Sequence, residues 1–123
     1  MKWFEELPSQ CPPADAVPAQ GRFFRIAKGL PTESEDYFSQ RSLQPNKVFI
    51  GEGIDECIVR SVSVFCSLDE AKMRLRLPKF RTQTIVAVDL EPSDGVIKKT
   101  FGPSHYSWWR SVDFNFSKAI LAL

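Results

Sequence analysis

The sequence predicts a single α+β domain, built mostly from an antiparallel β-sheet with two or three short helices. The chain has 123 residues, which is the length of one domain. Segments of strand-like composition outnumber segments with helical spacing, and the helical segments fall between strands, as is typical of α+β domains. Hydrophobic residues make up 43% and charged residues 25%, shares that are ordinary for a folded chain.

The first residues, 1–21, form a proline-rich arm, and residues 22–123 form the domain. Pro8, Pro12, Pro13 and Pro18 fall in this arm. Because proline lacks the backbone N–H, the arm is neither a helix nor a central strand. Trp3 and Phe4 are too hydrophobic for a free tail, so we expect them to fix an extended arm on the domain. The alternative is a disordered leader that binds a partner.

The first strand is predicted over 22–28, where aromatic and β-branched residues lie between Gly21 and the breakers Gly29 and Pro31. Thr32-Glu33-Ser34-Glu35 has the pattern of a capping box, with threonine at the N-cap and glutamate at N3. A helix is therefore expected from about 33 to 42.

The middle of the chain predicts a short strand or edge piece at 48–50 and a short helix capped by Asp55 that ends at Arg60. Residues 61–66 alternate polar and apolar, which favours a strand. Ser67-Leu68-Asp69-Glu70 is a second capping box, and the helix that follows is stopped by Pro78.

The C-terminal half carries the clearest strand signal of the chain, the buried-type run 84–90. Pro92-Ser93-Asp94-Gly95 predicts a turn, because proline presets φ and glycine supplies a positive φ. Further β segments are expected at 96–97, 106–109, 112–116 and 119–123.

Charge and apolar runs exclude several classes of function. The net charge of +1 argues against a general polyanion binder, so nucleic acid is not the expected partner. No apolar run reaches the roughly 20 residues that span a bilayer, so no membrane partner is expected. The N-terminus lacks the apolar region of a signal peptide, and we expect a cytoplasmic protein.

The three cysteines, Cys11, Cys57 and Cys66, have no Cys-x-x-Cys spacing. An odd count without that spacing fits neither a disulfide framework nor a zinc site, so no metal is expected. Cys57 and Cys66, which have apolar neighbours, are interpreted as small core residues.

Residues 104–109 gather a histidine, a tyrosine and two tryptophans, including the single histidine of the chain, His105. One interpretation is structural: the rings serve the core while their polar tips find partners. The other is functional: the aromatics form a slot for a planar group such as a nucleobase or nicotinamide. Arginine and serine side chains would then hold phosphate or ribose oxygens.

The order of segments adds a resemblance. A Ser61-Val62-Ser63 strand start, a capped helix from Ser67 and the buried strand 84–90 ending before Pro92-Ser93-Asp94-Gly95 are similar to the middle of the ADP-ribosyltransferase-like superfamily, which includes small RES-type NAD-degrading toxins. The resemblance implies NAD as cofactor, an arginine of the first strand on its phosphate or ribose, serines lining the nicotinamide pocket, and a late-strand acid that activates the ribose. Arg25 matches the first role and Ser61 or Ser63 the second; no glutamate follows Glu91 to fill the third.

We therefore hypothesise that the protein binds NAD or another nucleotide. We expect Arg25, Ser61 or Ser63, His105 and Tyr106 to converge on one cleft, because each lies at or beside a predicted strand. The candidate catalytic residues are His105 and Tyr106, and the candidate cofactor-binding residues are Arg25, Arg60, Ser61 and Ser63. Whether the chain is an enzyme stays open. The alternative is a non-catalytic interaction module that binds an acidic protein partner through the basic segment 72–81.

Overall fold

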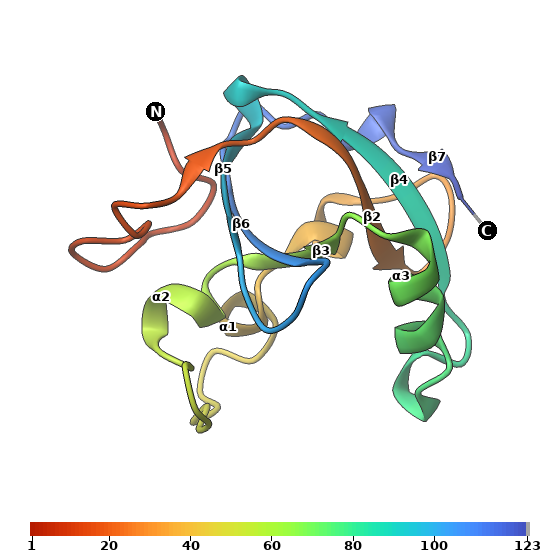
Figure 1. The fold of residues 1–123 in the computed structure, drawn as a ribbon, viewed down its shortest axis with the longest axis horizontal. Coiled ribbons are helices and arrows are strands. Elements are labelled where there is room, and N and C mark those ends of the chain that lie inside the picture. Colours follow the sequence, from red (N-terminus) through yellow and green to blue (C-terminus); the bar gives the residue numbers. More distant parts are fainter. Residues whose placement is uncertain (123) are drawn as a thin grey trace.

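The computed structural model describes residues 1–122, and seven strands of that range form one antiparallel sheet. Along the sheet the order is β1 (Val17–Pro18), β5 (Gly95–Lys99), β6 (His105–Arg110), β3 (Val62–Phe65), β2 (Gly21–Ala27), β4 (Thr84–Leu90) and β7 (Ile120–Leu121). The sheet is strongly curved, so that β5 and β6 stand opposite β2 and β4 with β3 between them (Figure 1). The predicted α+β class is confirmed.

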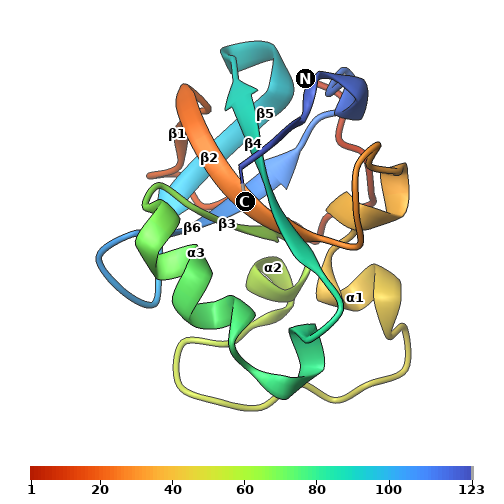
Figure 2. The same ribbon diagram turned by 90° about the vertical axis from the view of Figure 1, so that its right-hand side faces the viewer.

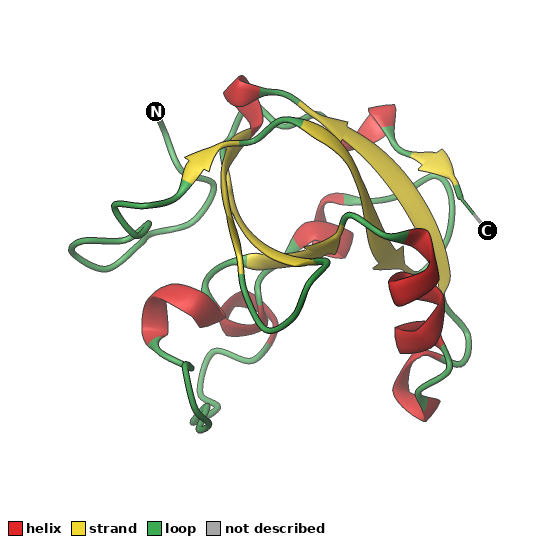
Figure 3. Cartoon of the chain, in the orientation of Figure 1, coloured by secondary structure: helices red, strands yellow, loops and turns green. Residues whose placement is uncertain are grey.

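Three short α-helices accompany the sheet in the described residues: α1 (Gln40–Leu43), α2 (Glu56–Val59) and α3 (Leu68–Leu75). Single 3₁₀ turns add η1 (Ser34–Tyr37), η2 (Pro78–Phe80), η3 (Pro92–Asp94) and η4 (Phe116–Lys118). Long loops separate these helices and make up most of the N-terminal arm (Figure 3). None of the described helices is long and apolar enough to cross a bilayer.

The sheet buries two apolar layers because side chains alternate between its faces. The inner layer packs Phe23, Val64 and Trp108 with Tyr37 and Phe114 inside the curve. The outer layer is smaller: α3 covers Phe65 and Ile85 through Ala71, which is fully buried.

The sheet opens between β2 and β3. These strands share a single residue pair, Phe24 with Phe65, whereas β2 and β4 pair along seven residues. Beyond this pair, β2 and β3 are linked by a side chain: Arg25 Nη1 on β2 donates a hydrogen bond to the carbonyl oxygen of Ser63 on β3 at 2.8 Å.

The N-terminal arm is fixed on the domain at its start. Trp3 forms a β-bridge with Ser111, and the N–H of Phe4 donates to the Arg110 carbonyl at 2.9 Å. The Phe4 ring lies 3.8 Å beneath the Arg110 guanidinium and stacks at a tilt on Phe38, with centroids 5.7 Å apart. The expected packing of Trp3 and Phe4 is confirmed, and the arm goes on to supply the edge strand β1.

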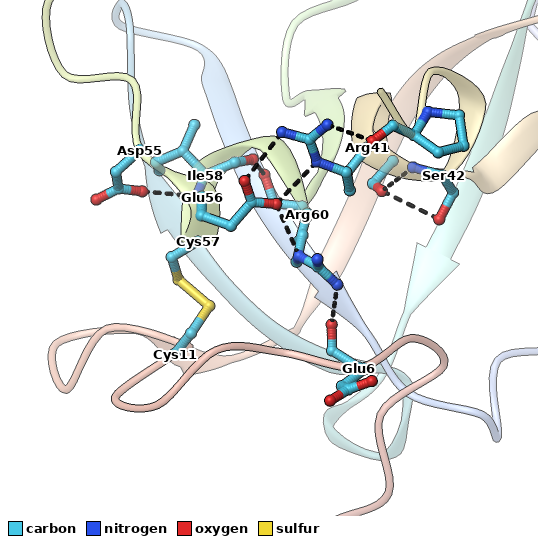
Figure 4. Close-up of polar contacts among 12 residues, drawn as sticks. Glu6, Cys11, Arg41, Ser42, Asp55, Glu56, Cys57, Ile58 and Arg60 are labelled. Atoms are coloured by element: carbon cyan, nitrogen blue, oxygen red, sulfur yellow. Dashed lines mark hydrogen bonds and ion pairs between the residues drawn. A yellow bond between two sulfur atoms is a disulfide. The ribbon is translucent and has the colours of Figure 1, made fainter. Parts of the chain in front are cut away.

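A disulfide between Cys11 and Cys57 joins the arm to α2 (Figure 4). From the same helix, Glu56 pairs with Arg41 and Arg60, and Arg60 Nη1 donates to the carbonyl of Glu6 on the arm. The expectation that the cysteines form no disulfide and that Cys57 and Cys66 are core residues is wrong: Cys57 is bonded, and Cys66 is a free, exposed thiol.

Three element predictions from the sequence are also wrong. Instead of one helix over 33–42, the chain forms η1, with Glu33 at its N-cap, and then α1, capped by Ser39. Thr32 is not a cap because its hydroxyl donates to the Phe116 carbonyl and accepts from Tyr37. Residues 48–50 are not a strand, and Arg41 holds the loop beside them through the carbonyls of Gln44, Pro45 and Lys47. The segment 112–116 does not form a strand either, since 112–115 are irregular and Phe116 begins η4.

Candidate functional site

A pocket of about 260 Å³ lies where β2 and β3 separate. In Figure 2, α3 stands on one side of this region and α1 on the other. The strands β2, β3 and β6 each contribute to its lining, respectively through Arg25, Ser63 and His105. Three of the predicted site residues therefore converge, because these strands are neighbours in the sheet. Phe24 of β2 pairs with Phe65 of β3, and Phe65 pairs with His105 of β6. Because neighbouring strands lie about 4.8 Å apart, the backbones of Phe24 and His105 are roughly 10 Å from each other.

Arg25 is the cation at the base of the opening. Its Nε donates to the carbonyl of Asp36 at 3.0 Å and its Nη1 to the carbonyl of Ser63 at 2.8 Å. Among the described residues it forms no ion pair with a carboxylate. Burial lowers the pKa of Arg25 to about 10, so it remains a cation at neutral pH. A half-buried guanidinium without a carboxylate partner favours the approach of an anion.

His105 is the second polar group of the pocket. Its Nδ1 lies 3.0 Å from the Thr100 carbonyl and 3.1 Å from the Thr100 hydroxyl. A carbonyl oxygen only accepts, so Nδ1 carries the proton and Nε2 of the neutral ring carries the lone pair. Burial lowers the pKa of His105, and the positive charges of Arg74 and Arg25 lower it further, which outweighs the opposing hydrogen bond to Thr100. The ring is therefore neutral at pH 7.

The wall formed by α3 and η2 is basic and aromatic. Arg74 lies 5.7 Å from the centroid of Phe65, and Lys79 lies 5.0 Å from that of Phe80. All four side chains line the pocket, and neither cation is ion-paired among the described residues. The rings offer apolar surface, and the cations offer charge beside it.

The opposite wall carries the acids of the pocket. Both carboxylate oxygens of Asp36 accept hydrogen bonds from backbone N–H groups, those of Lys28 at 3.1 Å and Glu33 at 2.9 Å. Glu35 pairs with Lys28 at 2.9 Å through one oxygen and is exposed. Both carboxylates line the pocket, and the sequence analysis named neither as a site residue.

The remaining predicted site residues lie elsewhere. Arg60 pairs with Glu56 and bonds the arm, and the Ser61 hydroxyl donates to the Ile58 carbonyl at 2.7 Å. Tyr106 follows His105 in the same strand and so faces the other side of the sheet. There its ring meets Phe23 edge-on, with centroids 5.3 Å apart, inside the inner apolar layer.

Sequence reasoning also left out Arg74, Lys79 and Phe80 as site residues. Their basic segment was identified from its charge, but its position beside Arg25 depends on how α3 packs on β2 and β4. No group of three or more His, Cys, Asp or Glu side chains in the described part of the chain is placed to hold a metal.

Comparisons with known proteins give no relative for this chain: no family model matches it, and neither a curated protein nor a solved structure does so significantly.

Proposed function

We propose that the pocket binds a nucleotide-type ligand and that NAD is the first candidate. The observation that carries this proposal is the convergence of Arg25, Ser63 and His105, from three neighbouring strands, on one opening where the arginine has no carboxylate partner. The resemblance to the ADP-ribosyltransferase-like superfamily implies the same roles: Arg25 would contact the phosphate or ribose of NAD, and Ser63 would line the nicotinamide pocket. In this interpretation His105 stands on a late strand, where that resemblance implies an acid.

The chemistry of the lining supports a phosphate-bearing ligand with a planar group. Arg25 Nη2 makes no hydrogen bond within the described chain, and a guanidinium is suited to phosphate oxygens. His105 Nε2 offers an acceptor to a ligand hydroxyl or amide. The rings of Phe65 and Phe80 supply apolar surface for a base or a pyridine ring.

The size of the pocket sets how much of a ligand enters. Pockets for small molecules usually measure about 300–1,000 Å³, and this one, at about 260 Å³, is slightly smaller. We therefore expect one nucleotide half of NAD to enter, with the other half outside the mouth. A cytoplasmic location, where NAD and nucleotides are available, belongs to the same proposal.

The test is calorimetric titration and thermal unfolding with NAD, ADP-ribose, AMP and inorganic phosphate. A ligand at about 100 times its dissociation constant stabilises the folded protein by roughly 2.7 kcal/mol. Lys79→Gln, at the exposed rim, is expected to weaken binding without unfolding the domain.

The matched pair is Arg25→Gln and Arg22→Gln, both on β2. Arg22 is exposed and pairs with Asp89 on β4, away from the pocket. We expect Arg25→Gln to abolish binding and Arg22→Gln to leave it unchanged. Equal affinities for both variants, or no binding of any of the four ligands by the wild type, would end the proposal.

A further inference from the structure

The segment 72–81, which forms the second half of α3 and all of η2, concentrates positive charge without acidic partners among the described residues. Over residues 72–81 there are five cations and no acid: Lys72, Arg74, Arg76, Lys79 and Arg81. Because the chain totals +1 and five positive charges lie here, the rest of the chain carries −4. We call these five cations the basic strip.

None of the strip's cations forms an ion pair in the described part of the chain. Elsewhere, ion pairs are made by six of the cations: Arg22, Lys28, Arg41, Arg60, Lys98 and Lys118. Six of the eleven cations outside the strip thus have an acidic partner among the described residues, whereas none of the five in the strip has one. A surface of one sign with no internal partner attracts a molecule of the opposite sign.

The same segment exposes large apolar side chains between its cations. Met73 is 60% and Leu77 is 41% exposed, whereas Ala71 on the opposite side of α3 is fully buried against the sheet. Met73 lies in the last half of α3, and Leu77 is the extended residue that joins α3 to η2. Methionine adapts its shape to apolar partners. The segment 72–81 therefore exposes two large apolar side chains, Met73 and Leu77, in sequence between its cations.

We propose that this surface docks an acidic protein segment that also carries apolar side chains. Carboxylates complement the basic strip, and apolar side chains cover Met73 and Leu77. A nucleic acid would use the cations and leave that apolar pair exposed, so its charge alone fits less of the surface. The proposal holds whether or not the pocket binds a nucleotide.

The docked segment also controls the mouth of the pocket. Arg74 and Lys79 belong to the basic strip and line the pocket as well, together with Phe80. When a carboxylate of the docked segment pairs with Arg74 or Lys79, that cation can no longer bind an anionic ligand in the pocket, and the segment covers one wall of the opening. The acidic segment and the pocket ligand therefore bind competitively, and the partner regulates access to the site.

The experiment uses the whole protein and a synthetic peptide with glutamate and leucine in a helical repeat. Two-dimensional NMR with labelled protein is expected to show shifts confined to residues 68–81 and the pocket rim, and calorimetry gives the affinity. The variant Lys72→Glu/Arg76→Glu is expected to lower the affinity for the peptide by about tenfold or more, a change of about 1.4 kcal/mol in binding free energy. The variant Met73→Ser/Leu77→Ser is expected to lower the affinity for the peptide as well.

The matched control is Lys2→Glu/Lys99→Glu, which makes the same charge change at two exposed cations outside the strip. Affinity for the peptide is expected to change less than twofold in this variant. Equal weakening in both charge variants would overturn the proposal, and so would shifts located elsewhere.

Two further probes decide the class of partner: a single-stranded oligothymidylate and vesicles of phosphatidylserine and phosphatidylcholine. Tighter binding of either one than of the peptide would overturn the choice of a protein partner. Competition is measured with AMP, which is expected to lose apparent affinity as peptide is added. Absence of AMP binding would count against the nucleotide proposal alone, because the peptide shifts are read independently.

Discussion

Removing the Cys11–Cys57 disulfide should destabilise the domain by about 4 kcal/mol at most. The two cysteines are 46 residues apart in sequence. In the chain-entropy treatment, closing a loop of about that size removes roughly 14 cal/mol/K from the unfolded ensemble, or about 4 kcal/mol at 25 °C. Trp3, Phe4 and β1 still hold the arm when the bond is absent, so the domain is expected to fold.

The assay is urea unfolding of the Cys11→Ala/Cys57→Ala variant against the wild type, each with and without reductant. Cys66→Ala is the matched control, since Cys66 is a free thiol on the surface. We expect about 2–4 kcal/mol for the double variant and a negligible change for the control. A change below about 0.5 kcal/mol in oxidised protein would refute the reasoning. Because the cytosol keeps thiols reduced, titration of free thiols in protein taken from cells also tests the cytoplasmic expectation.

Three other measurements follow from single contacts. Ser67→Ala should lower the free energy of unfolding by about 0.5–2 kcal/mol, because the Ser67 hydroxyl accepts from the N–H of Glu70; a silent substitution would contradict this cap. Phe4→Ala should cost about 2 kcal/mol in the same assay, because the ring supports the Arg110 guanidinium; an unchanged midpoint would mean that the arm adds no stability. His105→Gln should flatten the acid side of the stability profile: folding lowers the pKa of His105, so the unfolded chain binds more protons and the wild type loses stability as pH falls below about 6.5. A wild type and variant with parallel profiles between pH 7 and 5 would contradict that last expectation.

Strands were predictable from the sequence where burial alone decides them. Thr84–Leu90 forms β4 over the predicted residues because its apolar centre, Ile85 to Val88, is buried on both faces of the sheet. The helix after Ser67 was predictable because its cap is local. The helix expected over 33–42 was not, since the Thr32 hydroxyl bonds Phe116, which is 84 residues away. Cysteine pairing across 46 residues was also beyond local patterns.

The candidate site was predictable in part. Arg25, Ser63 and His105 were correctly expected to converge, since each lies at or beside a predicted strand. Tyr106 was misplaced because adjacent residues of a strand point to opposite faces. Arg74 and Lys79 join the pocket through the packing of α3 on the sheet, a tertiary contact that no local pattern indicates.

The most direct test of the central proposal is an NMR titration of the labelled protein with NAD. Binding at the pocket predicts saturable shifts of the Arg25, Ser63 and His105 resonances, with those of Arg60 and Ser61, which lie outside it, unchanged. The imidazole of His105 should report the contact at Nε2, since Nδ1 is held by Thr100. Saturating shifts centred on another surface, or none at millimolar NAD, would contradict the account.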